Sequence, residues 1–277
     1  LLGLVGSEMC IRDRFFASRG FRRYSGFMKR PFFALLAAWV FLTRIPLPIA
    51  KPEERDFETA PGFYPLVGLA IGAIGAAGFA LGWAIGGASI AAIFGTAATL
   101  LATGAFHEDG LAALFDGLGA STAERMKEIM RDSRLGTFGA AALFLVLLLK
   151  VAALSQLPFM LALAALPVAH GASRLSAVTV IATSRYARAE GIAKPVAKGI
   201  GAAPLMVATL TGIAAVAIGA TVLGPGAVLC GLAGLCVGHV TTRLLFERKL
   251  GGYTGDCLGA VQQISEVGFY LGLIAWL

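Results

Sequence analysis

The stretch FYPLVGLAIGAIGAAGFALGWAI, residues 63–85, contains no charged side chain. An α-helix needs about twenty consecutive apolar residues to cross the hydrocarbon core of a bilayer, so this stretch predicts a transmembrane helix. Similar apolar stretches follow at roughly residues 89–106, 137–154, 159–183, 204–223, 227–242 and 258–277. The sequence therefore predicts an all-α, polytopic integral membrane protein with about seven transmembrane helices.

The composition supports a membrane protein and argues against a nucleic-acid partner. The chain is 57% hydrophobic and 14% charged, whereas soluble domains are about a quarter charged. Its 36 glycines fit helices packed closely through small residues, as in the runs 68–72 and 234–238. The net charge of +7 is not arranged in a basic stripe with interleaved aromatic residues. The four cysteines lack the spacing of a zinc or redox site.

Three separators between the apolar stretches carry no charge and predict tight helical hairpins. They are Gly86-Gly87, Gln156-Leu157-Pro158 and Gly224-Pro225-Gly226. The loops that end at residues 61, 136, 203 and 256 then share one side of the membrane. Three of these loops carry basic residues, namely Arg125, Lys127, Arg131, Arg134, Arg185, Arg188, Lys194, Lys198, Arg243, Arg248 and Lys249. The positive-inside rule places that side in the cytoplasm.

This topology depends on the first apolar run, residues 32–43. The run is short for a span and is followed by Arg44-Ile45-Pro46, so a re-entrant or interfacial N-terminal helix is predicted. If the run crossed the membrane, the basic loops would face outward. The basic residues Lys150 and Arg174 fall within predicted spans, and Arg174 is expected to reach a polar interior or an interface.

Residues 1–27 differ from the rest of the chain. The run 5–14 resembles translated adapter sequence, and Met28-Lys29-Arg30-Pro31 reads as a natural start. We therefore expect a non-native or disordered extension at residues 1–27 and a single membrane-embedded domain at residues 28–277. A cleaved basic targeting segment is the alternative, although residues 1–5 are too short for its apolar core.

Acidic side chains gather in one interval. Asp109 and Asp116 are seven residues apart, which places them on one helical face, and Glu108 lies at the edge of that face. Clustered carboxylates at the mouth of a membrane are costly unless they are neutralised, and Mg²⁺ prefers such oxygen donors and bridges them to phosphates. Asp132 and Asp256 are further candidate ligands. The alternative is a solvated acidic loop paired with nearby Arg and Lys.

A short basic helix is expected next. The pattern Ser121-Thr122-Ala123-Glu124 is typical of a capping box that opens a helix through residue 130. Arg125, Arg131 and Arg134 would then be available to bind phosphate oxygens. Alternatively, these arginines only anchor a cytoplasmic loop.

A second polar island, residues 249–259, precedes the last span. Its glycines allow close approach of a ligand, and Asp256 could either cap the helix or complete a metal site. The turn is not a nucleotide P-loop, because it lacks the Gly-Lys-Ser/Thr ending. His107 is a candidate ligand or base, whereas His170 and His239 read as core histidines. Carboxylates, arginines and glycines together are typical of phosphoryl transfer.

Five motifs resemble the cobalamin synthase family, the adenosylcobinamide-GDP ribazoletransferases. They are residues 41–46 (FLTRIP), 63–68 (FYPLVG), 106–112 (FHEDGLA), 128–136 (EIMRDSRLG) and 251–256 (GGYTGD). The resemblance runs from about residue 28 to the C-terminus. It implies a Mg²⁺-dependent enzyme of the bacterial inner membrane, with its site facing the cytoplasm. Such an enzyme joins adenosylcobinamide-GDP to α-ribazole or its 5′-phosphate and releases GMP.

The site residues expected from the motifs fall into three groups. The catalytic group is His107, Asp109, Asp116, Arg131 and Arg134. Substrate contacts are expected from Arg125, Ser133, Gly252, Thr254 and Gly255. Magnesium is expected at Glu108, Asp109 and Asp116, with Asp132 or Asp256.

One position departs from the family pattern. Ala113 stands where the family usually has a third aspartate, one turn from Asp109. The sequence leaves open whether this change impairs activity. It also leaves open whether the protein forms a homo-oligomer, how many metal ions it binds, which residue is the base and which of the two acceptors it prefers.

Two other functions are alternatives. A CDP-alcohol phosphotransferase lacks its Asp-Gly-x-x-Ala-Arg core here, and a transporter fits poorly with charge gathered in loops on one side.

Overall fold

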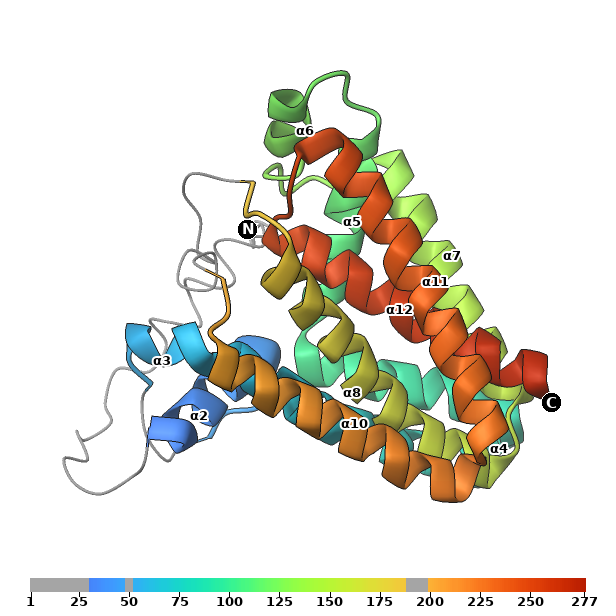
Figure 1. Ribbon diagram of the computed structural model, residues 1–277. Coiled ribbons are helices and arrows are strands. Elements are labelled where there is room, and N and C mark those ends of the chain that lie inside the picture. The colour runs from blue at the N-terminus through green and yellow to red at the C-terminus, as the bar shows by residue number, and fades with distance from the viewer. Residues whose placement is uncertain (1–29, 48–51, 188–198) are drawn as a thin grey trace.

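The computed structural model describes residues 30–47, 52–187 and 199–277 (Figure 1). The extension expected at residues 1–27 and the basic residues Arg188, Lys194 and Lys198 lie outside this part. The helices are α2 (Arg30–Leu42), α3 (Glu54–Thr59), the 3₁₀ helix η1 (Ala60–Phe63), α4 (Tyr64–Thr103), α5 (Phe106–Leu118), α6 (Ala123–Ile129), α7 (Thr137–Gln156), α8 (Phe159–Thr183), α10 (Ala202–Leu223), α11 (Pro225–Leu250) and α12 (Gly255–Trp276). The described residues form no β-strand, and the all-α prediction is confirmed.

Six helical segments are long and apolar enough to cross a membrane. They are Glu54–Thr103, Thr137–Gln156, Phe159–Thr183, Ala202–Leu223, Pro225–Leu250 and Gly255–Trp276. The first contains a reversal within α4, where Gly87 has a φ of 74°. The two limbs pack together, because a Cβ on Gly82 would lie 2.7 Å from the Cα of Ala91. The predicted hairpin is present. The sequence prediction counted its two limbs as separate spans, whereas the structure joins them in one helical segment.

Two of the helix ends that differ from the sequence prediction have a clear physical reason. The second limb of α4 ends at Thr103, because Gly104 and Ala105 both adopt left-handed backbone conformations, with φ of 66° and 55°. The other difference is α11, which continues to Leu250, well past the predicted end near residue 242. An Arg243–Glu247 ion pair of 2.9 Å supports this polar extension.

Helix α2 has 13 residues, too few for a straight crossing. Its Phe41 stacks on Tyr64 with ring centroids 5.9 Å apart and meets Phe106 edge to face at 5.2 Å. The helix therefore packs on the starts of α4 and α5. Its placement at the membrane surface or within it stays a prediction.

The loops that the sequence assigned to one side contact one another. Tyr253 donates its N–H to the carbonyl of Arg185 at 2.8 Å, which ties the α8 loop to the α11–α12 loop. A Cβ on Gly62 would lie 2.9 Å from the carbonyl oxygen of Pro204, so η1, which precedes α4, touches the start of α10. One end of the bundle therefore gathers the loops that carry charge.

The uncharged hairpin tips lie together at the other end. Trp83, near the α4 reversal, packs on Phe159 at the start of α8 with ring centroids 5.1 Å apart. Gly226, at the start of α11, meets the ring of Trp276 at the end of α12. This segregation of charge follows the predicted topology.

Glycines allow the closest helix crossings. A Cβ on Gly72 of α4 would lie 2.5 Å from the carbonyl oxygen of Leu166 on α8. Likewise, a Cβ on Gly238 of α11 would lie 2.7 Å from the carbonyl oxygen of Ile264 on α12. Both glycines belong to the small-residue runs noted in the sequence, and these runs therefore serve packing.

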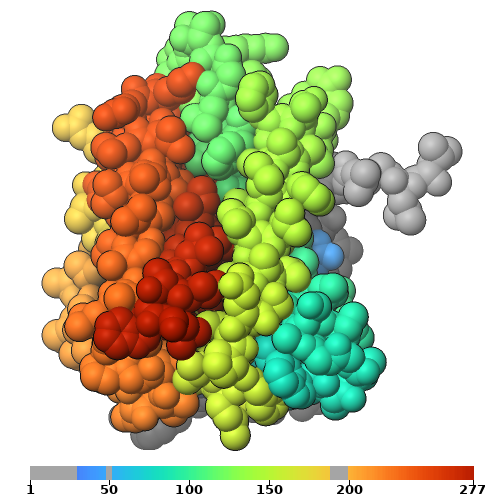
Figure 2. Space-filling model, turned by 90° about the vertical axis from the view of Figure 1, so that its right-hand side faces the viewer, coloured from blue at the N-terminus to red at the C-terminus, as the bar shows by residue number. Residues whose placement is uncertain are grey.

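The outer surface is apolar along α7. Figure 2 shows this helix running along one face next to α12. Large apolar side chains on α7 are exposed, namely Phe138, Phe144, Leu145, Leu148 and Leu149. An exposed apolar surface of this kind fits a helix that faces lipid.

Candidate active site

Helix α5 carries the acidic motif and packs against α7 and α12 (Figure 1). It begins after the left-handed turn at residues 104–105, with Glu108 and Asp109 in its first turn, where the helix dipole favours negative charge. Glu108 and His107 are buried, whereas Asp109 is exposed. Burial raises the pKa of Glu108, opposed by the charge of Lys150, and partial burial also raises the pKa of Asp109.

The acidic motif and the last motif are in backbone contact. A Cβ on Gly110 would lie 2.8 Å from the carbonyl oxygen of Asp256. One turn away, a Cβ on Gly259 would lie 2.9 Å from the carbonyl oxygen of His107. Two segments separated by well over a hundred residues therefore meet where α5 and α12 begin.

Asp116 reaches a third motif. Its carboxylate accepts the N–H of Gly136 at 2.8 Å and the N–H of Gly139 at 2.7 Å. These donors belong to the first turn of α7, whose N–H groups lack partners within the helix. A side chain on either glycine would collide with the carboxylate. The structure thus gives Asp116 a structural partner on each oxygen.

The first motif also approaches the site. Arg44 donates its N–H to the carbonyl oxygen of Ala102 at 2.7 Å, and its side chain lies against Gly104. Gly104 is the residue at which the chain turns from α4 into α5. The FLTRIP segment therefore packs beside the acidic motif.

The basic helix α6 forms as expected, but its N-cap is Thr122 and not Ser121. The Thr122 side chain accepts the N–H of Arg125. The apolar side of the helix is buried through Met126, and Arg125 points outward to pair with Glu128 at 2.9 Å. This ion pair is exposed and contributes little to stability.

The loop after α6 is exposed throughout residues 131–135. Arg134 pairs with Asp132 at 2.6 Å, and its hydrogen bonds lower the pKa of Asp132 to about 2. Arg131 and Ser133 lie in the same exposed turn. The expected phosphate-binding side chains are therefore accessible, and Asp132 is engaged by an arginine.

In the polar island at residues 249–259, backbone conformation and packing require glycine at two positions. Gly251 ends α11 with φ of 64°, and Gly252 lies so close to the carbonyl of Arg185 that a Cβ would collide with it. Thr254, and not Asp256, caps α12, because its side chain accepts the N–H of Cys257. Gly255 has open space where a Cβ would stand.

Sequence analysis missed a polar cluster inside the bundle. Glu266 of α12 is fully buried, and its carboxylate lies 3.0 Å from the ammonium of Lys150 and 3.2 Å from Nε2 of His170. Gln262 donates to it at 2.7 Å and Tyr270 at 3.3 Å. A glutamate within an apolar span was the available signal, since buried charges in membranes are paired and mark functional sites.

Arg174 is buried beside this cluster. It therefore lies in a polar interior, which is one of the two surroundings that the sequence predicted for it. Its Nη1 lies 3.1 Å from Nδ1 of His170 and 3.0 Å from the same residue's carbonyl oxygen. A guanidinium can only donate, so Nδ1 accepts and Nε2 carries the proton toward Glu266. His170 is therefore a satisfied core histidine, as expected.

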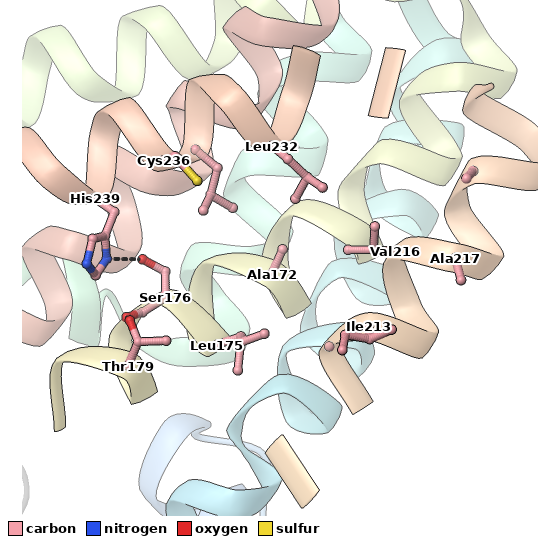
Figure 3. A pocket seen from close by; sticks show the side chains of 13 residues that line it. Ala172, Leu175, Ser176, Thr179, Ile213, Val216, Ala217, Leu232, Cys236 and His239 are labelled. Atoms are coloured by element: carbon pink, nitrogen blue, oxygen red, sulfur yellow. Dashed lines mark hydrogen bonds between the residues drawn. The ribbon is translucent and has the colours of Figure 1, made fainter. Parts of the chain in front are cut away.

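An apolar groove of about 460 Å³ opens between α8, α10 and α11. Figure 3 shows its lining, with Ser176 directed at His239 at one end. Those two side chains lie 2.8 Å apart. None of the lining residues belongs to the five motifs, so this groove lies apart from the candidate site at the α5–α12 contact.

The comparisons with known proteins identify the family. A family model described as CobS, cobalamin-5-phosphate synthase, matches residues 34–274. The chain belongs to this family. It is accordingly a membrane transferase of cobalamin biosynthesis.

Curated relatives of the CobS family match nearly their whole length. One from Ralstonia nicotianae, named adenosylcobinamide-GDP ribazoletransferase, is 41% identical over 254 residues, which cover 88% of this chain and 96% of the relative. Relatives with the same name from Shewanella sp. (strain ANA-3) and Vibrio cholerae are 39% and 38% identical, covering 92% and 93% of their own lengths and 86% and 87% of this chain. No solved structure matches.

The donor set for magnesium can be tested against the geometry. Within residues 30–47, 52–187 and 199–277, no three His, Cys, Asp or Glu side chains are grouped as a metal site. Magnesium, however, is usually held by one or two carboxylates together with substrate phosphates. Asp109 and Asp256 belong to the two segments in contact, and a magnesium site completed by substrate phosphates would draw on these two carboxylates.

The α5–α12 contact yields a first prediction. We expect Gly110→Ala to lower the free energy of unfolding by about 1–3 kcal/mol, because its Cβ would meet backbone atoms that cannot move aside cheaply. Thermal unfolding in detergent measures this. Gly119→Ala is the matched control, since its nearest neighbour would be 4.0 Å away. Equal stability of the two variants would contradict the close contact.

Proposed function

We propose that this chain transfers the adenosylcobinamide phosphate group of adenosylcobinamide-GDP to α-ribazole or its 5′-phosphate and releases GMP. The carrying observation is the meeting of the FHEDGLA and GGYTGD motifs at Gly110 and Asp256, in a chain that covers almost all of its similarly named relatives. The proposed orientation has this end of the bundle facing the cytoplasm of a bacterial inner membrane.

The bond changes are those of a phosphoryl transfer. The oxygen of a ribose hydroxyl that is free in both acceptors attacks the cobinamide-side phosphorus, and the bond from that phosphorus to the bridging oxygen breaks. GMP leaves with the bridging oxygen, and the hydroxyl proton passes to a base. Catalysis of this kind rests mainly on positioning and on neutralising charge.

The exposed groups around α5 supply these functions. Asp109 is the accessible carboxylate of the first turn, which suits a group that either holds magnesium or takes the hydroxyl proton. Arg131 and Arg134, in the exposed loop, would stabilise the charge that grows on GMP. His107 is buried beside Phe106, which favours Asp109 over His107 as the base.

Magnesium, when bound, would neutralise the pyrophosphate. Asp109 and Asp256 would hold it together with substrate oxygens. Asp116 contributes by fixing the start of α7 through its two backbone hydrogen bonds. That role keeps the exposed loop of residues 131–135 next to α5.

The test is GMP release by the purified chain started at Met28, given adenosylcobinamide-GDP, α-ribazole and Mg²⁺. We expect release that requires all three. An Ala113→Asp version restores the acidic position that the family usually has. Activity in that version alone would mean that the reaction is right but this chain is impaired, whereas no release from either would overturn the proposal.

A further inference from the structure

The polar cluster inside the bundle is connected to the acidic motif by one side chain. Gln263 of α12 donates from Nε2 to Oε1 of Glu108 at 2.8 Å. The same amide accepts from the ammonium of Lys150 at 2.8 Å. Lys150 in turn pairs with Glu266 at 3.0 Å. A continuous chain of buried contacts therefore runs from Glu266 to the first turn of α5.

The direction of each bond in this chain is fixed by chemistry. An ammonium has no acceptor, so the oxygen of the Gln263 amide must face Lys150. The amide nitrogen then faces Glu108, and its second hydrogen is donated to Gln262 at 2.8 Å. Both donors and the acceptor of Gln263 are thus used, and the side chain has one stable orientation.

Glu108 and Asp109 are adjacent in sequence but face different surroundings. Glu108 is 5% exposed and points into the bundle, while Asp109 is exposed. On a helix, successive residues are separated by about 100°. Holding Glu108 in the interior therefore fixes the rotation of α5 about its axis and, with it, the direction of Asp109.

We propose that Glu108 is a positioning residue, anchored by Gln263 and Lys150 so that the neighbouring Asp109 faces the substrate. This inference rests on the proposed function for its catalytic consequence, and it replaces the metal-ligand role that the sequence suggested for Glu108. The other oxygen of Glu108, Oε2, has no hydrogen-bond partner among the described residues. The test must therefore separate an anchor from a ligand.

The variants are Glu108→Gln, Glu108→Leu and Gln263→Met. Glutamine keeps an oxygen that accepts from Gln263 but has no negative charge for a cation. An anchor predicts that Glu108→Gln retains kcat and its magnesium requirement within about 3-fold. Glu108→Leu and Gln263→Met should each lower kcat by roughly 10- to 100-fold, because a small misplacement of a reacting group costs about that much. An increase of 10-fold or more in the magnesium requirement of Glu108→Gln would overturn the anchor in favour of a ligand.

A second measurement does not depend on the reaction. Hydrogen–deuterium exchange should become faster at residues 106–112 in Glu108→Leu and Gln263→Met, and stay unchanged there in Glu108→Gln. Ser176→Ala is the control. It removes a buried hydrogen bond between Ser176 and Ser265, which are 3.1 Å apart, and neither residue belongs to the series of contacts from Glu266 to Glu108. Unchanged exchange in Gln263→Met would overturn the anchor. An inactive parent chain with the expected exchange pattern would overturn only the proposed function.

Discussion

Asp109→Asn is expected to reduce GMP release by about 10²- to 10⁴-fold, the usual contribution of a positioned acid–base or charge-stabilising group. The substitution keeps the shape of the side chain and removes its charge and basicity. Because Asp109 is exposed at the start of α5, the free energy of unfolding should change by less than about 0.5 kcal/mol. Initial rates and thermal unfolding of the same preparation measure both effects.

Asp132→Asn is the matched control for this prediction. Asp132 is also an exposed carboxylate at the charged end of the bundle, but it is engaged by Arg134. We expect its replacement to lower the rate by less than 10-fold. A rate for Asp109→Asn close to that of the parent chain would remove Asp109 from the mechanism, and equal losses in the two variants would indicate a general effect of charge.

Hydropathy was sufficient to predict most of the fold. The span 159–183 was predicted with the bounds that α8 has, because Pro158 starts it and the apolar run stops at Ser184. Hydropathy failed where polar residues continue a helix. The last turns of α11 carry charge outside yet bury Phe246 and Leu250, so the helix persists after the apolar run ends.

The motifs predicted the place of the candidate site but not the partners within it. Spacing put Asp109 and Asp116 on one face, as their seven-residue separation requires. It could not show that Asp116 meets the backbone of residues 136 and 139, since that contact depends on how α5 and α7 pack. The glycine at 252 was assigned to ligand approach, whereas the structure gives it a backbone neighbour, Arg185.

The buried ion pair was beyond local patterns. Lys150 and Glu266 lie on different spans, far apart in sequence, and each looks like an isolated charge in an apolar run. Their pairing follows from the packing of α7 on α12. Sequence reasoning can identify such charges as costly, but it cannot choose the partner.

Removing the charge of Glu266 should have the largest effect on stability. Glu266→Gln leaves the ammonium of Lys150, which is 2% exposed, without its carboxylate. Breaking a buried ion pair by neutralising one partner costs about 3–5 kcal/mol, because the remaining charge is buried unpaired. The midpoint of unfolding in detergent should fall accordingly, well below that of Ser176→Ala.

The double variant Lys150→Met, Glu266→Gln tests whether the cost is that of an unpaired charge. Once Lys150 is also neutral, part of the loss should be recovered, so that the cycle gives a coupling energy of at least about 1–3 kcal/mol between the two sites. Additive losses would show that the pair contributes no coupling. Recovery of stability should not restore catalysis, because Lys150→Met also removes the donor that orients Gln263 toward Glu108. In this variant we therefore expect stability to recover in part while turnover stays low. The ion pair balances charge within the bundle, whereas the Gln263 amide holds Glu108 and thereby α5 in place.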